Sequence, residues 1–270
     1  MKSKAKPEAP DVRPDDMLPD VVAVSDPNAT RIVVILDRSG SMQSCCESTV
    51  AGFNDFVREQ KKQSGTATLK LVQFDDQYEV VFDESIQNVP ELTQATFVPR
   101  GSTALLDAQG KTIAILQEEL AKLSSSKRPA KVIVVTMTDG MENASKEYKK
   151  QQVADLIQKY TDQNKWQFIY IGANQDAVKV AESMNIPLRN TMSYNTSNAR
   201  GVMGMSVSNL VSSYRSAGLD DLTSSTMGFS AEDRKSALED NTFSSTIASV
   251  ANTPSSVNTP VTVPPDKDDA

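Results

Sequence analysis

The chain has 270 residues, of which 39% are hydrophobic and 23% charged, and its formal net charge is −7. This composition predicts one domain of about 190 residues with a packed core, together with polar tails. The sequence has no histidine and only two cysteines. It therefore excludes imidazole acid–base catalysis, Ser-His-Asp and Cys-His nucleophiles, His-ligated metals and four-cysteine clusters.

The acidic excess lies near the two ends of the sequence. Residues 1–30 carry four basic and six acidic side chains, and residues 217–270 carry three and nine. Residues 31–216 are balanced, with 21 basic and 20 acidic side chains. This balance predicts no nucleic-acid partner and no polybasic membrane surface.

The sequence also predicts a cytoplasmic location. No apolar stretch approaches the roughly 18 residues of a membrane-spanning helix. The first residues carry positive charge without the apolar region of a secretory signal. Cys45 and Cys46 are neighbours, so a bond between them would be strained, and we expect free thiols that serve in packing.

Proline marks the limits of the expected domain, because five of the 13 prolines lie in residues 1–30 and four in residues 254–265. We predict that residues 1–29 form a disordered Pro-rich leader and that residues 30–218 form the domain. Residues 219–270 are predicted to be a disordered, Ser/Thr-rich acidic tail. Within this tail, a short helix near Ser230–Leu238 is only weakly indicated.

Strand and helix patterns alternate within the expected domain. Arg31–Leu36 and Lys131–Thr136 are apolar, β-branched runs, which are typical of strands buried on both faces. Leu69–Phe74 and Tyr78–Phe82 are separated by a tight turn and should pair antiparallel. The same patterns predict strands at Trp166–Ile171 and Leu188–Ser193, and helices around Val50–Val57, Leu106–Leu123, Val153–Tyr160, Asn174–Met184 and Asn198–Ser216.

This order of elements predicts an α/β fold. The sheet should be doubly wound and mostly parallel, with one antiparallel strand and with helices on both faces. Ligands of such sheets bind beyond the carboxyl ends of the strands, where the strand order reverses. Asp37 ends the first apolar strand and Asp139 follows Lys131–Thr136, so both carboxylates are expected at that edge.

Three hydroxyl side chains accompany these two carboxylates. Ser39 and Ser41 alternate after Asp37 and should point the same way, around a glycine that lets the backbone turn tightly. Thr103 lies just before the long helix that begins near Leu106. Carboxylate and hydroxyl oxygens together suit Mg²⁺ or Mn²⁺ and suit neither zinc nor copper.

The segments Asp37-Arg-Ser-Gly-Ser41 and Thr138-Asp139-Gly140, together with Thr103, resemble the metal-ion-dependent adhesion site of von Willebrand factor A domains. The resemblance covers about residues 31–216 and fills all five motif positions. It implies the Rossmann-like fold of integrin I domains, with the first and fourth strands side by side. The compact domain looks like the stand-alone proteins of this family from bacteria and phages.

The resemblance also implies roles for the five residues. Ser39, Ser41 and Thr103 would bind the metal directly, whereas Asp37 and Asp139 would bind it directly or through water. An Asp or Glu of a partner protein would complete the coordination. Neutral hydroxyls leave much of the +2 charge uncompensated, so the open position attracts an anion.

Three functions follow as hypotheses. The first is a Mg²⁺-dependent protein-binding module that captures a partner's carboxylate and has no enzymatic activity. The second is a structural or assembly protein whose metal site is vestigial and which acts through its tails or surface. The third is a metal-dependent hydrolase, which the sequence favours least because no histidine, paired Glu or phosphate-binding glycine loop accompanies the site.

Overall fold

A six-stranded sheet forms the centre of the fold, with the strand order β3-β2-β1-β4-β5-β6. The structure is a computed structural model that describes residues 29–173, 177–224 and 226–239, all within the unit Met1–Glu239. The strands are β1 (Thr30–Asp37), β2 (Ala67–Phe74), β3 (Tyr78–Ser85), β4 (Lys131–Thr138), β5 (Gln167–Ala173) and β6 (Thr191–Tyr194). Only β3 runs antiparallel to its neighbour, which is β2. The predicted mostly parallel sheet with one antiparallel strand is therefore confirmed.

The central strands are buried on both faces, as their apolar runs predicted. Every residue of β1, β4 and β5 is buried. Successive side chains of a strand point to opposite faces, so Ile32 and Val34 join one core cluster while Val33 and Ile35 join the other. Two separate layers of helices are needed to cover these two faces.

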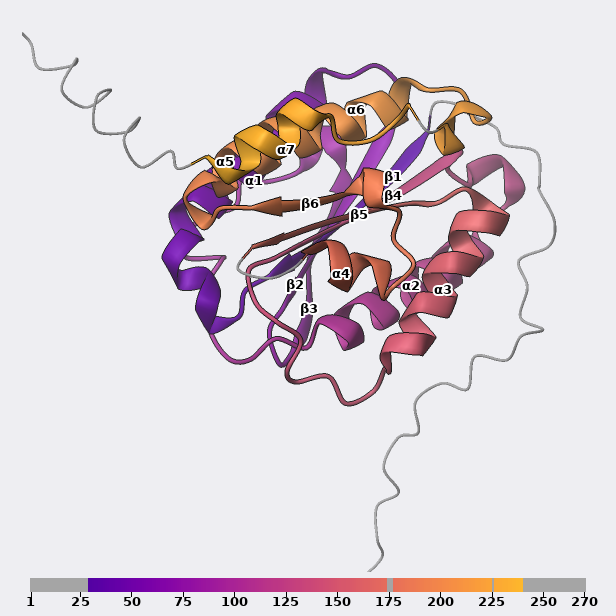
Figure 1. Ribbon diagram of the computed structural model, residues 1–270. Helices are drawn as coiled ribbons and strands as arrows, with labels where there is room; N and C mark the ends of the chain where they lie inside the picture. Colours follow the sequence, from indigo (N-terminus) through magenta and orange to yellow (C-terminus); the bar gives the residue numbers. More distant parts are fainter. Residues whose placement is uncertain (1–28, 174–176, 225, 240–270) are drawn as a thin grey trace, which may run out of the picture. The chain divides into compact units, whose positions relative to one another are not determined.

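The helices are α1 (Cys46–Lys62), α2 (Leu105–Lys122), α3 (Lys150–Asn164), α4 (Ala177–Glu182), α5 (Ala199–Gly201), α6 (Ser208–Ser216) and α7 (Ala231–Leu238), with a π-helical stretch at Val202–Val207 between α5 and α6. Figure 1 shows α1, α5, α6 and α7 on one face of the sheet and α2 and α3 on the other. Residues 174–176 of the predicted helix Asn174–Met184 lie outside the described residues. In the part of the chain that the structure describes, no helix combines the length and apolarity that crossing a membrane requires.

The packed domain extends beyond residue 218, where we predicted that it ends. Leu222, Phe229 and Ala237 are buried and belong to the same core cluster as Ile32 and Val34 of β1. The prediction of a disordered tail from residue 219 is therefore wrong for residues 219–224 and 226–239, because these three side chains anchor the segment to the core. Residues 1–28 and 240–270 lie outside the described residues, so the predicted disorder there stays a prediction.

The strand order reverses between β1 and β4. From β1 the chain continues to β2 on one side, and β4 pairs with β1 on the other side in parallel register, with Leu36 opposite Met137. Both strands thus end at the same edge of the sheet, which brings Asp37 and Thr138 together. The resemblance implied this pairing of the first and fourth strands, and the structure shows it.

Candidate metal centre

Asp37 occupies the last position of β1, and its side chain is fully buried. Its Oδ1 accepts a 2.6 Å hydrogen bond from the backbone N–H of Ser39, and its Oδ2 accepts one of 2.6 Å from Thr138 Oγ1. Burial raises the pKa of Asp37 to about 6, although these hydrogen bonds act in the opposite direction. In the sequence, Thr138 stands out only as part of the motif, and its role in orienting this carboxylate becomes visible only in the structure.

Ser39 and Ser41 lie where the chain turns from β1 into a 3₁₀ helix, Gly40–Cys45. Their Oγ atoms are 3.1 Å apart, so the two hydroxyls face the same space as predicted. Ser41 Oγ also donates a 2.6 Å hydrogen bond to Asp139 Oδ1, although the two residues are far apart in sequence. The loops after β1 and β4 therefore meet through these side chains.

A third loop, which precedes α2, brings Thr103 to the same place. The backbone of Gly101 has φ +66°, and a side chain there would meet Asp76 Oδ1 at 2.5 Å, so glycine is required. Gly101 O accepts a hydrogen bond from Gly40 N (3.2 Å), and Ala104 N donates to Asp75 O (2.9 Å). These backbone bonds fix the position of the buried Thr103 between the loops that follow β1 and β2.

The three hydroxyl oxygens converge above Gly140. A Cβ atom placed on this glycine would lie 2.8 Å from Thr103 Oγ1, 3.2 Å from Ser41 Oγ and 3.5 Å from Ser39 Oγ. Beside them, the buried Asp139 Oδ2 has no hydrogen-bond partner among the residues that the structure describes. Burial raises the pKa of Asp139 above its ordinary value of 3.8, against the hydrogen bond from Ser41.

This set of donors fits a divalent cation. Across the described ranges, no three His, Cys, Asp or Glu side chains gather closely enough to hold a metal, so a site here would combine two carboxylates with hydroxyls. Such hard, all-oxygen ligands suit Mg²⁺ or Mn²⁺. A cation would also favour the charged forms of two aspartates whose burial disfavours them. The structure brings all five predicted residues together, and metal binding by them stays a prediction.

Two acidic side chains that no sequence motif marks hold the loop after β4 in place. Glu142 accepts hydrogen bonds from the backbone N–H of Leu106 at the start of α2 (3.0 Å) and from two N–H groups of its own loop. Asp107 accepts three backbone N–H groups of residues 146–148, at 2.7–2.9 Å. Carboxylates that accept backbone bonds across a loop have no spacing pattern, so only the structure reveals them.

Arg38, within the Asp37–Ser41 motif, points away from the hydroxyls and connects the site to the outer strand β3 and to the loop after β2. Its guanidinium pairs with the buried Asp75 (3.1 Å) and with Glu79 (2.7 Å). Arg100 pairs with the same oxygen of Asp75 at 2.8 Å. Burial alone would raise the pKa of Asp75, but the hydrogen bond from Arg100 and the two positive charges lower it. This ion-pair network supports the loops on the side of β2 and β3.

The two cysteines lie beside the site as free thiols, as predicted. Cys45 is buried, and burial raises its pKa to about 11. Burial also raises the pKa of the half-buried Cys46. Both are therefore neutral near pH 7, and Cys45 packs in the core cluster that contains α1.

Comparisons with known proteins agree with this architecture. No curated protein matches the sequence. Solved structures that match this chain include the von Willebrand factor type A protein from Catenulispora acidiphila (12% identity, TM-score 0.47, covering 69% of this chain and 42% of that one). They also include the von Willebrand factor domain of the type V pili tip protein Mfa5 from Porphyromonas gingivalis (10% identity, TM-score 0.51, covering 73% of this chain and 98% of that one). A further match is the pilus adhesin SpaC from Lactobacillus rhamnosus GG (13% identity, TM-score 0.50, covering 69% of this chain and 30% of that one). The chain spans less than half the length of the first and third of these structures.

The sequence profile of the von Willebrand factor type A domain family matches residues 32–205. This range begins in β1, ends in the π-helical stretch before α6, and includes all five candidate metal ligands. Because the match covers well over half of the sequence, the chain belongs to the von Willebrand factor type A domain family.

Proposed function

We propose that the chain is a divalent-metal-dependent protein-binding module in which a bound Mg²⁺, or Mn²⁺, captures a carboxylate of a partner protein. Members of this domain family are commonly adhesion or protein-interaction modules. The observation that carries the proposal is the convergence of three hydroxyl oxygens above Gly140, next to a buried Asp139 oxygen without a partner among the described residues. Ser39, Ser41, Thr103, Asp37 and Asp139 would hold the ion.

The charge balance of the site favours an anionic partner. Both oxygens of Asp37 already accept hydrogen bonds, from Ser39 and Thr138. The other candidate metal ligands near Asp139 are neutral hydroxyl oxygens. A bound divalent cation would supply an incompletely compensated positive charge on the exposed side of Ser41. A carboxylate of Asp or Glu is the anionic group that a protein partner offers at neutral pH.

Exposed apolar side chains lie in the loops that surround the site. Met141, directly after Gly140, is 69% exposed, and Val98, in the loop that leads to Thr103, is 53% exposed. A partner whose acidic residue has an apolar neighbour would cover them on binding, which adds hydrophobic contact to the capture of its carboxylate. We propose no enzymatic activity for this surface, and a cytoplasmic location remains our prediction from the sequence.

Two serines of the same turn provide a matched pair of variants. Ser41→Ala removes a hydroxyl that faces the candidate metal position, whereas Ser44→Ala removes an exposed hydroxyl that donates a hydrogen bond to the carbonyl of Ser41. Titration of Mg²⁺ into each protein should show binding to the wild type and Ser44→Ala and weak or no binding to Ser41→Ala. Equal Mg²⁺ affinity in all three proteins would contradict the ligand assignment.

The same variants test partner capture. Proteins retained from a lysate by the wild type and Ser44→Ala in Mg²⁺, but neither by Ser41→Ala nor in EDTA, are the expected partners. Replacing Asp and Glu residues of such a partner by Asn and Gln, one at a time, should identify one carboxylate that is essential for binding. Capture that persists in EDTA would contradict the proposal and would favour a structural protein that acts through its tails or surface.

A further inference from the structure

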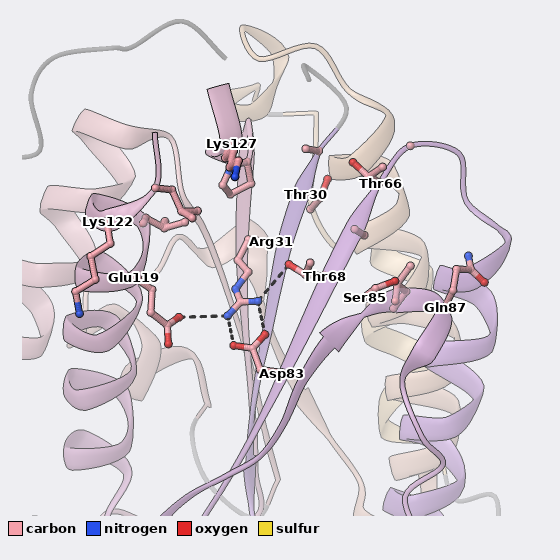
Figure 2. Close-up of a pocket in the computed structure, with 17 residues that line it drawn as sticks. Thr30, Arg31, Thr66, Thr68, Asp83, Ser85, Gln87, Glu119, Lys122 and Lys127 are labelled. Atoms are coloured by element: carbon pink, nitrogen blue, oxygen red, sulfur yellow. Dashed lines mark hydrogen bonds and ion pairs between the residues drawn. The ribbon is translucent and has the colours of Figure 1, made fainter. Parts of the chain in front are cut away.

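A cavity of about 800 Å³ opens where the parallel strands β1 and β2 begin, at the end of these strands opposite the candidate metal centre (Figure 2). It lies among the first residues of β1 and β2, the last residues of β3 and the C-terminal turn of α2. Apolar side chains contribute much of its lining, namely Ala67, Ile86, Leu120, Leu123 and Pro129. The cavity is about the size of a small-ligand site, and the proposed protein-binding function does not use it.

Most of the charged side chains in and beside its wall form ion pairs. Arg31, which is largely buried, forms a bidentate ion pair with Asp83 (2.5 and 2.6 Å) and contacts Glu119 at 3.2 Å (Figure 2). Lys70 pairs with the same two acidic residues, so two cations and two anions neutralise each other. Lys122 and Lys127 also line the cavity. Lys122 is exposed, and its Nζ lies 3.9 Å from Oε2 of Glu118.

We propose that this cavity binds the chain's own segment Asp20–Asp26, whose sequence is Asp-Val-Val-Ala-Val-Ser-Asp. The segment leads directly to the cavity, because Ala29, the first described residue, is part of the lining. Val21–Val24 is the longest uninterrupted apolar run in residues 1–28. An extended chain from Ala29 back to Val24 reaches about 17 Å, so the valines can reach the cavity that Ala29 lines.

Charge complementarity supports the same occupant. The apolar run of the segment lies between Asp20 and Asp26, and two exposed lysines line the cavity, Lys127 and Lys122, of which Lys122 lies 3.9 Å from Glu118. Valine favours the extended conformation of a strand. Because only four residues, 25–28, connect the run to the described chain, docking is intramolecular and needs little intrinsic affinity.

Hydrogen–deuterium exchange of the full-length protein tests the proposal. Amides of residues 20–26 should exchange at least about tenfold more slowly than in an unfolded peptide of the same sequence. Val22→Asp should abolish this slowing, and Val12→Asp, in the same part of the chain but outside the segment, should preserve it. Unchanged exchange in β4 verifies that each variant is folded.

Exchanging the charges of the cavity lysines and the segment aspartates tests the proposal from the side of the cavity. Lys122→Glu combined with Lys127→Glu should speed exchange of the segment, and adding Asp20→Lys and Asp26→Lys should restore the slowing. Exchange at the unfolded rate in the wild type would overturn the proposal. So would slow exchange that is insensitive to both sets of variants, which would place the segment elsewhere. Slowing that grows with protein concentration would assign the cavity to a second copy and would also overturn it.

Discussion

Replacing Gly140 by alanine tests the candidate metal centre at the point where its hydroxyl oxygens converge. The new Cβ would lie 2.8 Å from Thr103 Oγ1 and 3.2 Å from Ser41 Oγ, inside the space where the hydroxyls converge. The backbone of Gly140 is not in the left-handed region, so alanine is strained only by these contacts. Gly40→Ala is a matched control in the neighbouring loop, because its Cβ would meet only Gly101 O, at an ordinary 3.5 Å.

The expected effect follows from the linkage between metal binding and folding. A ligand that binds only the folded state at a hundred times its dissociation constant raises the free energy of unfolding by about 2.7 kcal/mol. For a domain of this size, each kcal/mol raises the melting temperature by about 2–4 °C, so saturating Mg²⁺ should raise it by about 5–10 °C. Gly140→Ala should lose most of this increase, because the methyl group would enter the space on which the three hydroxyl oxygens converge, where we propose that the ion binds.

The measurement is the melting temperature of the wild type and both variants, in Mg²⁺ and in EDTA. Gly40→Ala should keep the Mg²⁺-dependent increase, and Gly140→Ala should melt at nearly the same temperature in both buffers. In EDTA, Gly140→Ala should lose about 1–3 kcal/mol of unfolding free energy, since the added methyl group crowds neighbouring side chains. An increase in Gly140→Ala equal to that of the wild type would refute the placement of the ion above this glycine.

Three further predictions concern the supports of the fold. Asp107→Ala removes the acceptor of three backbone N–H groups, so amide exchange of residues 146–148 should become faster and the domain should lose about 1–3 kcal/mol in urea unfolding. Arg215→Met removes the buried guanidinium that binds carbonyls at the end of α1 and should lower the free energy of unfolding by about 3 kcal/mol in the same assay. Burial alone would raise the pKa of Asp83, but Arg31 and Lys70 lower it below 3.8. The stability that the ion pairs of Asp83 provide is therefore fully present above pH 3.8 and is lost as the pH falls from 3.8 through the lower pKa of the folded state. Asp83→Asn should reduce that acid-dependent loss of unfolding free energy.

The strands could be predicted because β1 and β4 are buried on both faces, and burial on both faces selects the continuous β-branched runs that the sequence displays. The positions of Asp37, Ser39, Ser41 and Asp139 could be predicted because they lie at or after the ends of β1 and β4, which the topology brings together. Thr103 lies in the loop before α2, and it could be predicted from its place before the long helix and in the motif. The packing of the segment after residue 218 could not be predicted, because α7 has no apolar stripe and contributes only Ala237 to the core. Its one local signal is the capping box formed by Ser230 and Asp233, which predicts where a helix begins and says nothing about its packing.

The acidic residues around the candidate metal centre divide into two groups by what their oxygens bind. Asp107 and Glu142 accept backbone N–H groups, and Asp75 pairs with arginines, so these three hold the loops together. Asp139 instead retains one buried oxygen without a partner in the described part of the chain. Since the loops are fixed by bonds within the protein, a bound ion would not have to order them, and little of its binding free energy would be lost to conformational entropy. The affinity for metal should therefore depend mainly on how well Asp37, Asp139 and a partner's carboxylate compensate its charge.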